Sequence, residues 1–260
     1  MVNKFERFIK RFYLIIIFIF LYAPIVTLMV YSFNDSKSMG RWNGFTFKWY
    51  AELLHNDSLI EALYYTILIA LIASIIATIV GTLTAIGINN MRGKRKSLLL
   101  SVNNLPIINP DIVTGVALMS LFIFLRFNFG FKTMLLAHIS FDIPYVILSV
   151  LPKLRQLPDN TIEAAMDLGA TPLYALRKVI IPQIKPGIFA GFLMAFTMSI
   201  DDFVISFFTT GPGVTNLSIE IYSMARRGIK PEINALSTLM FLTVLILLLI
   251  ANRKKKVEVN

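Results

Sequence analysis

Four aspartates stand inside long apolar runs of this 260-residue chain. They are Asp111, Asp142, Asp201 and Asp202, and the only Lys or Arg in the same runs is Lys132, at the very start of one of them. An ionisable group at the centre of a membrane span costs about 2.5–3.5 kcal/mol, so it normally faces a bundle interior or a water-filled path. A group of carboxylates without a local counter-charge requires a cation from elsewhere. The residue types therefore indicate a path or site for a cation.

Each aspartate also has a plainer interpretation. Asp201 and Asp202 could mark the outer end of a span, in water, and at most one of them easily faces a given axis because successive helical residues point about 100° apart. Asp142 could bond backbone groups that Pro144 leaves free. Asp111 follows Asn109-Pro110, which predicts either a broken helix that lines a cavity or a helix that starts late. Both alternatives place Asp111 near a helix N-terminus, where a carboxylate is favourable.

The elements that position these carboxylates must be membrane helices. Hydrophobic residues make up 56% of the chain and charged residues 15%, with a mean hydropathy of +0.71. Soluble domains carry about 25% charged residues, so the composition excludes a soluble enzyme and a disordered chain. The net charge is +10. In so apolar a chain this excess indicates basic cytoplasmic loops and membrane lipid as the surroundings, not nucleic acid.

Six apolar runs predict an all-α polytopic protein with six transmembrane helices. The runs are 12–33, 63–88, 97–125, 131–151, 186–208 and 234–251. The first is too long for a signal-peptide core, so we expect it to remain as a span. No internal repeat is visible in the sequence.

The basic residues predict the orientation. Of the 25 Lys and Arg residues, 17 lie on the side that holds both termini and eight on the other side, so both termini are expected in the cytoplasm. The expected organisation is a cytoplasmic N-terminus at 1–11, the first span at 12–33, an extracytoplasmic loop at 34–62, a five-helix core at 63–251 and a basic tail at 252–260.

The cytoplasmic connection 152–185 is patterned as two short helices. Asn160 or Asp159 can cap the first of them, and Glu163, three residues after Asn160, matches a capping box. Gly169 suits the position after a helix end where φ is positive. Thr171-Pro172 matches the start of a second helix, which we expect to stop before Pro182.

The paired alanines of the first short helix, Ala164 and Ala165, would present a smooth face that another protein can approach closely, with Glu163 as a charged contact. A surface hairpin without a partner is the alternative.

No constellation for catalysis or metal binding is present in the sequence. Cysteine is absent, and the two histidines, His55 and His138, are far apart in the chain. We expect His138 to be packed or hydrogen-bonded. Gly87 and Gly93-Lys94 do not match a phosphate-binding loop, because five residues separate the glycines instead of four and Arg95 stands in place of Ser or Thr. The chain is therefore expected to need no cofactor and to leave ATP hydrolysis to another subunit.

The cytoplasmic connection resembles the EAA loop of binding-protein-dependent ABC importer permeases. The matching residues are Glu163-Ala164-Ala165, Gly169, Val179-Ile180-Ile181-Pro182 and Pro186-Gly187, although Ile181 stands where Leu is common. The resemblance implies a type I ABC importer permease fold, MetI-like, in a bacterial inner membrane. It also implies that the loop is a coupling helix that docks on a cytoplasmic ATPase through Glu163, Ala164, Ala165, Gly169 and Pro182.

Further segments are similar to the PotC-type permease family of spermidine/putrescine importers. They are Asn109–Val113, Ser199–Asp202, Thr210–Pro212, Ile221–Met224 and Pro231–Leu236. This resemblance implies a PotB-like permease partner, an ABC ATPase dimer and an extracytoplasmic polyamine-binding protein. Polyamines are polycations, which fits the four aspartates as residues of the substrate path. Tyr222 is a further path candidate, because an aromatic ring attracts a cation.

Two other classes of function remain open from the residues alone. An ion-coupled secondary transporter of an organic cation would use Asp111 and Asp201 as proton or sodium sites, but it predicts internal repeats and no docking loop. A membrane enzyme would need a catalytic constellation, and neither histidine has a partner for one.

Overall fold

In the computed structural model, helices are the only extended regular elements among the described residues, with turns, loops and two isolated β-bridges between them. The structure describes the backbone of 4–37, 40–158, 160–227 and 231–257, and the side-chain surroundings from residue 9 onward in these ranges except 227, 244 and 247–257. The chain forms two compact units, one of residues 1–60 with 221–260 and one of residues 61–220.

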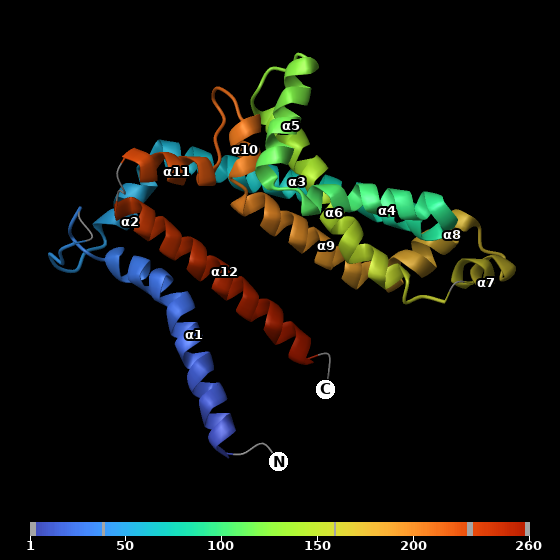
Figure 1. Cartoon of the computed structure of the whole chain (residues 1–260), viewed down its shortest axis with the longest axis horizontal. Coiled ribbons are helices and arrows are strands. Elements are labelled where there is room, and N and C mark those ends of the chain that lie inside the picture. Colours follow the sequence, from blue (N-terminus) through green and yellow to red (C-terminus); the bar gives the residue numbers. More distant parts are fainter. Residues whose placement is uncertain (1–3, 38–39, 159, 228–230, 258–260) are drawn as a thin grey trace. The chain divides into compact units, whose positions relative to one another are not determined.

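The first unit contains helix α1 (Lys4–Tyr31), helix α2 (Lys48–Leu54) and helix α12 (Pro231–Val257), and α12 packs against both of the others. The segment between α1 and α2 folds on itself. The indole N–H of Trp49 donates a hydrogen bond to the carbonyl of Asn34 at 2.7 Å, and the ring of Phe33 stacks on Phe45. The expected loop at 34–62 is therefore partly helical and internally bonded (Figure 1).

The second unit is built on two long helices that lie side by side, α6 (Phe131–Leu154) and α9 (Ile181–Asp201) (Figure 1). Two glycines of α9 allow this close approach. A Cβ atom on Gly191 would lie 3.2 Å from Cγ1 of Val146, and one on Gly187 would lie 3.2 Å from the carbonyl oxygen of Ser149. Small residues at such contacts are typical of helix packing in membranes.

Helix α3 (Asp57–Asn90) also packs on α6. A Cβ atom on Gly81 would lie only 2.8 Å from Cβ of Val146, so the two backbones touch at this glycine. Ala77 and Ala85, fully buried on α3, join Val146 and Val150 in one apolar cluster. Val146 is therefore enclosed by α3 on one side and α9 on the other.

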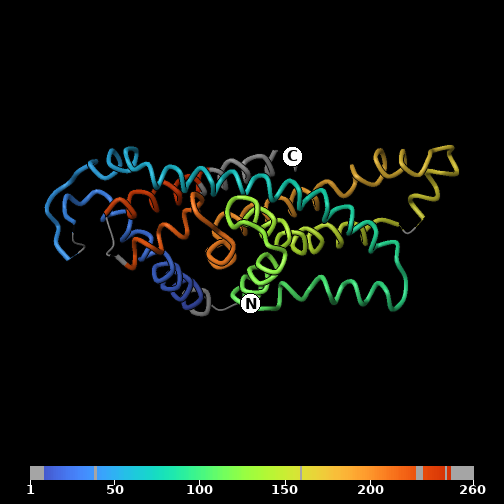
Figure 2. The backbone as a smooth tube through the Cα atoms, turned by 90° about the horizontal axis from the view of Figure 1, so that it is seen from above, coloured from blue at the N-terminus to red at the C-terminus, as the bar shows by residue number. Residues whose placement is uncertain are grey.

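The predicted third span is two helices, α4 (Gly93–Ile108) and α5 (Asp111–Phe124), bent by 105° at their junction (Figure 2). Pro110 explains the break, because a proline has no N–H to donate and disfavours helical conformation in the residue before it. Asn109 is accordingly extended, with φ −71° and ψ 143°. The break itself is confirmed, and so is the placement of Asp111 at a helix N-terminus.

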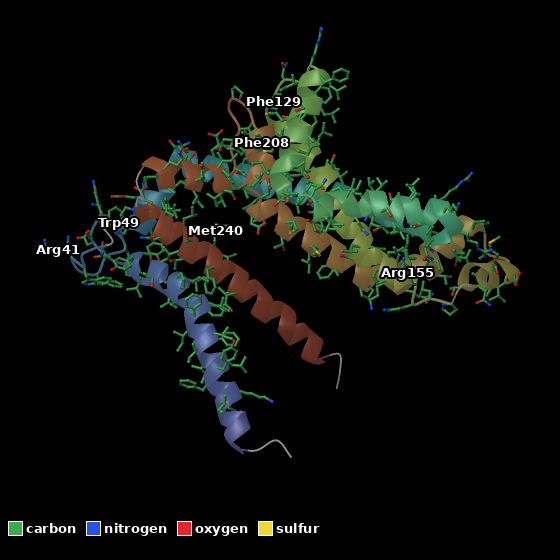
Figure 3. All side chains as sticks on the ribbon, in the orientation of Figure 1. Arg41, Trp49, Phe129, Arg155, Phe208 and Met240 are labelled. Carbon is green, nitrogen blue, oxygen red and sulfur yellow. The ribbon has the colours of Figure 1, made fainter. Side chains whose placement is uncertain are left out.

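The predicted fifth span is also divided, which corrects the single helix expected at 186–208. Helix α9 ends at Asp201, and a short helix α10 (Val204–Thr209) follows. Asp202 is extended, with ψ 125°. Helix α10 packs on α5, where the ring of Phe208, labelled in Figure 3, lies against Gly115.

The expected stop before Pro182 is wrong. Helix α8 (Pro172–Ala175) passes into a π-helical turn, η1 (Leu176–Ile180), and continues directly as α9. The wider π turn comes immediately before the proline, where the helix must accommodate a residue that donates no backbone hydrogen bond. The second short helix of the connection 152–185 is thus continuous with α9, which is long and apolar enough to cross a membrane.

Four helical segments are long and apolar enough to cross a membrane in the described part of the chain, or five if the bent pair α4–α5 is one span. The four are Ile9–Tyr31, Asp57–Asn90, Phe131–Leu154 and Pro172–Asp201. The sixth predicted span, 234–251, coincides with α12, but side chains at 244 and 247–251 lie outside the described residues. The remaining helices are α7 (Thr161–Asp167) and α11 (Leu217–Arg227).

Candidate functional site

The second unit holds all four aspartates, and they divide into an exposed pair and a buried pair. Asp111 is the first residue of α5 and Asp201 the last of α9, and both are exposed. The side chain of Asp202 is 7% exposed, and Asp142 is completely buried. Only Asp111 and Asp201 are therefore open to a ligand in this conformation.

Asp202 is occupied as the cap of helix α10. One carboxylate oxygen accepts the backbone N–H of Ser206 at 2.7 Å and the other that of Ile205 at 3.2 Å. The Ser206 hydroxyl donates a third hydrogen bond to the same carboxylate at 2.7 Å. A carboxylate in this position satisfies helix N–H groups that have no partner inside the helix. The two neighbouring aspartates thus differ, because Asp202 caps α10 whereas the side chain of Asp201 is exposed.

His138 on α6 connects α9 to α10. Its Nδ1 lies 2.5 Å from the Ser199 hydroxyl of α9, and its Nε2 lies 2.9 Å from the Ser206 hydroxyl of α10. The imidazole is 2% exposed, and Nε2 lies 3.6 Å from the Asp202 carboxylate. The expectation that His138 is packed and hydrogen-bonded is confirmed.

Asn216 completes this cluster from the loop that follows α10. Its side-chain amide donates to the Ser206 hydroxyl and to the Asp202 backbone carbonyl, both at 2.8 Å. The next residue, Leu217, donates its N–H to the Thr66 hydroxyl of α3 at 2.8 Å. Sequence reasoning did not single out Ser206 or Asn216. The four-residue spacing from Asp202 to Ser206 is a local signal for the former, whereas no local signal marks Asn216.

Asp142 lies one helical turn after His138 and faces the same packed interior. Neither of its oxygens has a hydrogen-bond partner among the described residues, and the carboxyl lies within electrostatic range of Asp202. The alternative in which it bonds backbone groups freed by Pro144 is therefore wrong for this conformation. Such a group is costly to bury as an anion, so it has to gain a proton or a cationic partner.

Tyr222 belongs to the first unit. Its side chain is exposed, and the guanidinium of Arg226 lies 6.0 Å from the centre of its ring. The ring already faces a cation of its own helix, α11.

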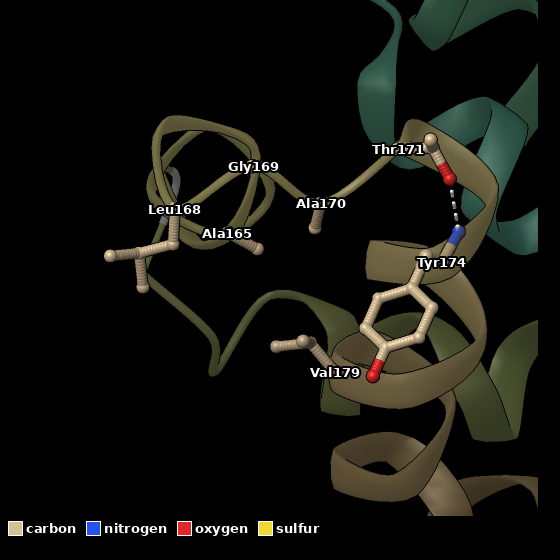
Figure 4. A pocket seen from close by; sticks show the side chains of 7 residues that line it. All are labelled: Ala165, Leu168, Gly169, Ala170, Thr171, Tyr174 and Val179. Carbon is tan, nitrogen blue, oxygen red and sulfur yellow. Dashed lines mark hydrogen bonds between the residues drawn. The ribbon is translucent and has the colours of Figure 1, made fainter.

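The connection 152–185 folds as two short helices in the order that the sequence predicts. Gly169 follows α7 with φ +88°, and the Thr171 hydroxyl accepts the N–H of Tyr174 at 3.3 Å to cap α8 (Figure 4). The capping box at Asn160 is wrong. Asn160 precedes α7, but its side chain makes no capping hydrogen bond. The other candidate for the cap, Asp159, lies outside the described residues.

The outer surface of this connection is apolar and open. Leu168 is 90% exposed, Leu173 and Tyr174 are also exposed, and Glu163 and Ala164 lie on the exposed side of α7. A groove of about 430 Å³ lies between α7 and α8, lined by Ala165, Leu168, Gly169, Ala170, Thr171, Tyr174 and Val179 (Figure 4). Exposed apolar groups beside a rigid turn mark a protein-interaction surface.

Comparison with known proteins agrees with this architecture. The whole fold is similar to a bacterial ABC transporter involved in the import of the acidic polysaccharide alginate, with a TM-score of 0.72 over 98% of this chain and 99% of the other, at 17% identity. At that identity the likeness concerns the fold, which is that of type I ABC importer permeases. The family model described as "Binding-protein-dependent transport system inner membrane component" matches residues 77–253.

Two relatives from Escherichia coli strain K12 are more similar in sequence. The spermidine/putrescine transport system permease protein PotC is 38% identical over 254 residues, which are 96% of each chain. The putrescine transport system permease protein PotI is 40% identical over 232 residues, 86% of this chain and 82% of the relative. The chain belongs to the family of binding-protein-dependent transport system inner membrane components.

Membership fixes the general role of the chain. It is a multi-pass inner-membrane permease that works with a binding protein and an ATPase, and it is not itself an enzyme. ATP is bound by the separate ATPase subunit, and the permease family uses no cofactor. The structure adds where the side chains of this permease lie.

Proposed function

We propose that this chain is the permease subunit of an ATP-driven importer for polyamines such as spermidine and putrescine. The observation that carries the proposal is the similarity, along nearly the whole chain, to relatives named for these two compounds. The carboxylates fit this cargo independently of that similarity, because a flexible polycation requires anionic groups along its path. A PotB-like permease is the proposed second half of the membrane path.

The path is proposed to use Asp111 and Asp201 as transient counter-charges. Both are exposed, and each stands at the end of a helix where the chain breaks inside a predicted span. Broken helices at membrane depth are tolerated where they line a cavity. Asp202 supports the path by holding the break beside Asp201, and Asp142 and Tyr222 remain candidates for a conformation in which they are uncovered.

The ATPase is proposed to dock on α7 and the groove behind it. Glu163, Ala164 and Ala165 form the approach surface, and Gly169 sets the turn to α8. Because α8 continues without interruption through η1 into α9, a push on the docking surface is transmitted along one helical rod past Pro182. The far end of that rod is Asp201. This continuity gives ATP hydrolysis a mechanical route to the path.

The chain is proposed to lie with both termini in the cytoplasm, as the distribution of its basic residues predicts. In this orientation residues 1–11, the coupling connection 152–185 and the tail 252–260 are cytoplasmic, the loop 34–62 is extracytoplasmic, and 63–251 forms the core. The binding protein then approaches from the side opposite the coupling connection.

The test is ATP hydrolysis by the complete complex in lipid vesicles, with the binding protein loaded with spermidine, with putrescine or with no cargo. We expect a polyamine-loaded binding protein to stimulate hydrolysis more than the empty one. Glu163→Lys should reduce that stimulation while the complex still assembles. Equal hydrolysis with loaded and empty binding protein would count against polyamine as the cargo.

A further inference from the structure

One buried histidine bonds both to the helix that ends at Asp201 and to the short helix that packs beside the one that starts at Asp111. We propose that His138 is a positioning residue that fixes α9 and α10 on either side of their break, and through them the two carboxylates Asp201 and Asp111. The inference rests on the proposed function for its transport readout, but its geometric part stands on the contacts of the described residues alone.

The hydrogen bonds determine which nitrogen of His138 donates. The Ser206 hydroxyl has a single proton, which it donates to Asp202. Its oxygen therefore accepts from the Asn216 amide and from Nε2 of His138, so Nε2 carries a proton. A neutral imidazole then accepts the Ser199 hydroxyl at Nδ1. Each ring nitrogen thus has a separate helix as its partner.

The bond to Ser199 positions Asp201. Ser199 lies two residues before Asp201 on the last turn of α9, and it is buried. Helix ends fray when their last groups lack partners. The bond from Ser199 to α6 keeps this last turn helical up to Asp201, whose own side chain is exposed and holds nothing in place.

The bond to Ser206 positions Asp111 indirectly. Ser206 is in the middle of α10, and α10 packs closely on α5, where a Cβ atom on Gly115 would lie 2.9 Å from the Phe208 ring. Gly115 is one turn after Asp111. A shift of α10 therefore moves the start of α5 with it, because packed helices have little free space between them.

No other described residue joins all three elements in this way. The Asn216 amide reaches Ser206 and the Asp202 carbonyl, which both lie at or after the break. The Thr133 hydroxyl of α6 bonds to Gly130 beside it and to the carbonyl of Thr209 at the end of α10, and neither partner is on α9. Loss of the imidazole would leave α10 capped and in apolar contact with α9, but would remove the hydrogen bonds that join both helices to α6.

The experiment uses three substitutions at one position in the assembled complex. His138→Leu removes both bonds, His138→Gln can restore the donor to Ser206, and His138→Asn can restore the bond to Ser199. Ser140→Ala is the matched control, since Ser140 is on the same helix, exposed, and bonded only to its own backbone at Leu136.

Helix geometry is measured first, by the distance between two spin labels. The chain has no cysteine, so Val113→Cys on α5 and Leu193→Cys on α9, both at exposed positions, label it cleanly. We expect a narrow distance distribution in the native background and in Ser140→Ala. His138→Leu should broaden or shift it, and His138→Gln should return part of the change. If His138→Leu fails to accumulate, the distance distributions of His138→Gln and His138→Asn are compared with that of the native background instead. Each of these variants restores only one of the two bonds, so we expect both distributions to be broader than the native one, and two native distributions would overturn the inference.

Transport is measured second. For His138→Leu we expect the maximal uptake rate per complex to fall about tenfold, the scale of one or two lost hydrogen bonds. The KM should stay near its native value because the binding protein captures the cargo, and ATP hydrolysis stimulated by that protein should persist. A role in folding alone would lower uptake and hydrolysis together, in proportion to the amount of complex.

An unchanged distance distribution in His138→Leu would overturn the inference, as would a changed distribution with native transport. A changed distribution in a complex whose native form moves no polyamine would instead refute the proposed function and leave the positioning role of His138 standing.

Discussion

At the scale of single residues, the two neighbouring aspartates at the end of α9 make opposite predictions. Asp201→Asn should lower the maximal uptake rate severalfold without changing the amount or stability of the complex, because the exposed Asp201 side chain supports no other part of the fold. Asp202→Asn should destabilise the chain by about 1–3 kcal/mol, because a buried carboxylate that accepts three hydrogen bonds is replaced by an amide that cannot accept them all. Uptake and thermal unfolding of the purified complex distinguish the two. The same phenotype from both substitutions would contradict the division of roles.

Single-residue features could be predicted from the sequence where neighbouring residues determine them, and could not where distant residues do. Gly169 and Thr171 were predictable, because a positive φ after a helix and a hydroxyl before a proline are decided by a few neighbouring residues. The capping box at Asn160 was wrong although its spacing fits, since a side chain can match a motif without making its bond. The partners of His138 lie 61 and 68 residues away, and only the packing of α6 on α9 and α10 brings them together.

At the scale of elements, the close contact between α3 and α6 can be tested with two glycine-to-alanine substitutions on α3, one at the contact and one away from it. Gly81→Ala should destabilise the chain by about 1–3 kcal/mol, because the new methyl group would lie 2.8 Å from Val146 and force the helices apart. Gly87→Ala is the control on the same helix, where nothing lies within 4 Å of the added atom. That substitution should be neutral or slightly stabilising, since alanine favours helix over glycine. Thermal unfolding of the two variants tests the packing, and equal stabilities would contradict it.

The apolar runs predicted where the long helices lie, but the points at which helices break were harder to predict. Pro110 disrupts a helix by itself, so the break before Asp111 was expected. The break at Asp202 has no proline or glycine, and the carboxylate that caps α10 produces it together with the buried partners of Ser206. Pro182 gave the opposite error. This proline suggested that the helix ends before it, but the π turn Leu176–Ile180 precedes the proline and the chain continues as α9.

At the scale of the whole molecule, the charge distribution predicts a topology that single cysteines can test. Asn160→Cys in the coupling connection should react with a membrane-impermeant maleimide only when the cytoplasmic side is open. Asn128→Cys, in the loop between α5 and α6, should react in intact cells. Both positions are exposed, and the chain contains no other thiol. Reaction of Asn160→Cys in intact cells would reverse the proposed orientation.

The central claim is that this permease carries polyamines with energy from ATP. The most direct measurement is uptake of labelled spermidine and putrescine by cells that lack the chain, with and without its restoration alongside its partners. We expect restored uptake that disappears when ATP is depleted and survives collapse of the ion gradients. Uptake that follows the ion gradients, or no uptake by a complex that is assembled in the membrane, would contradict the claim.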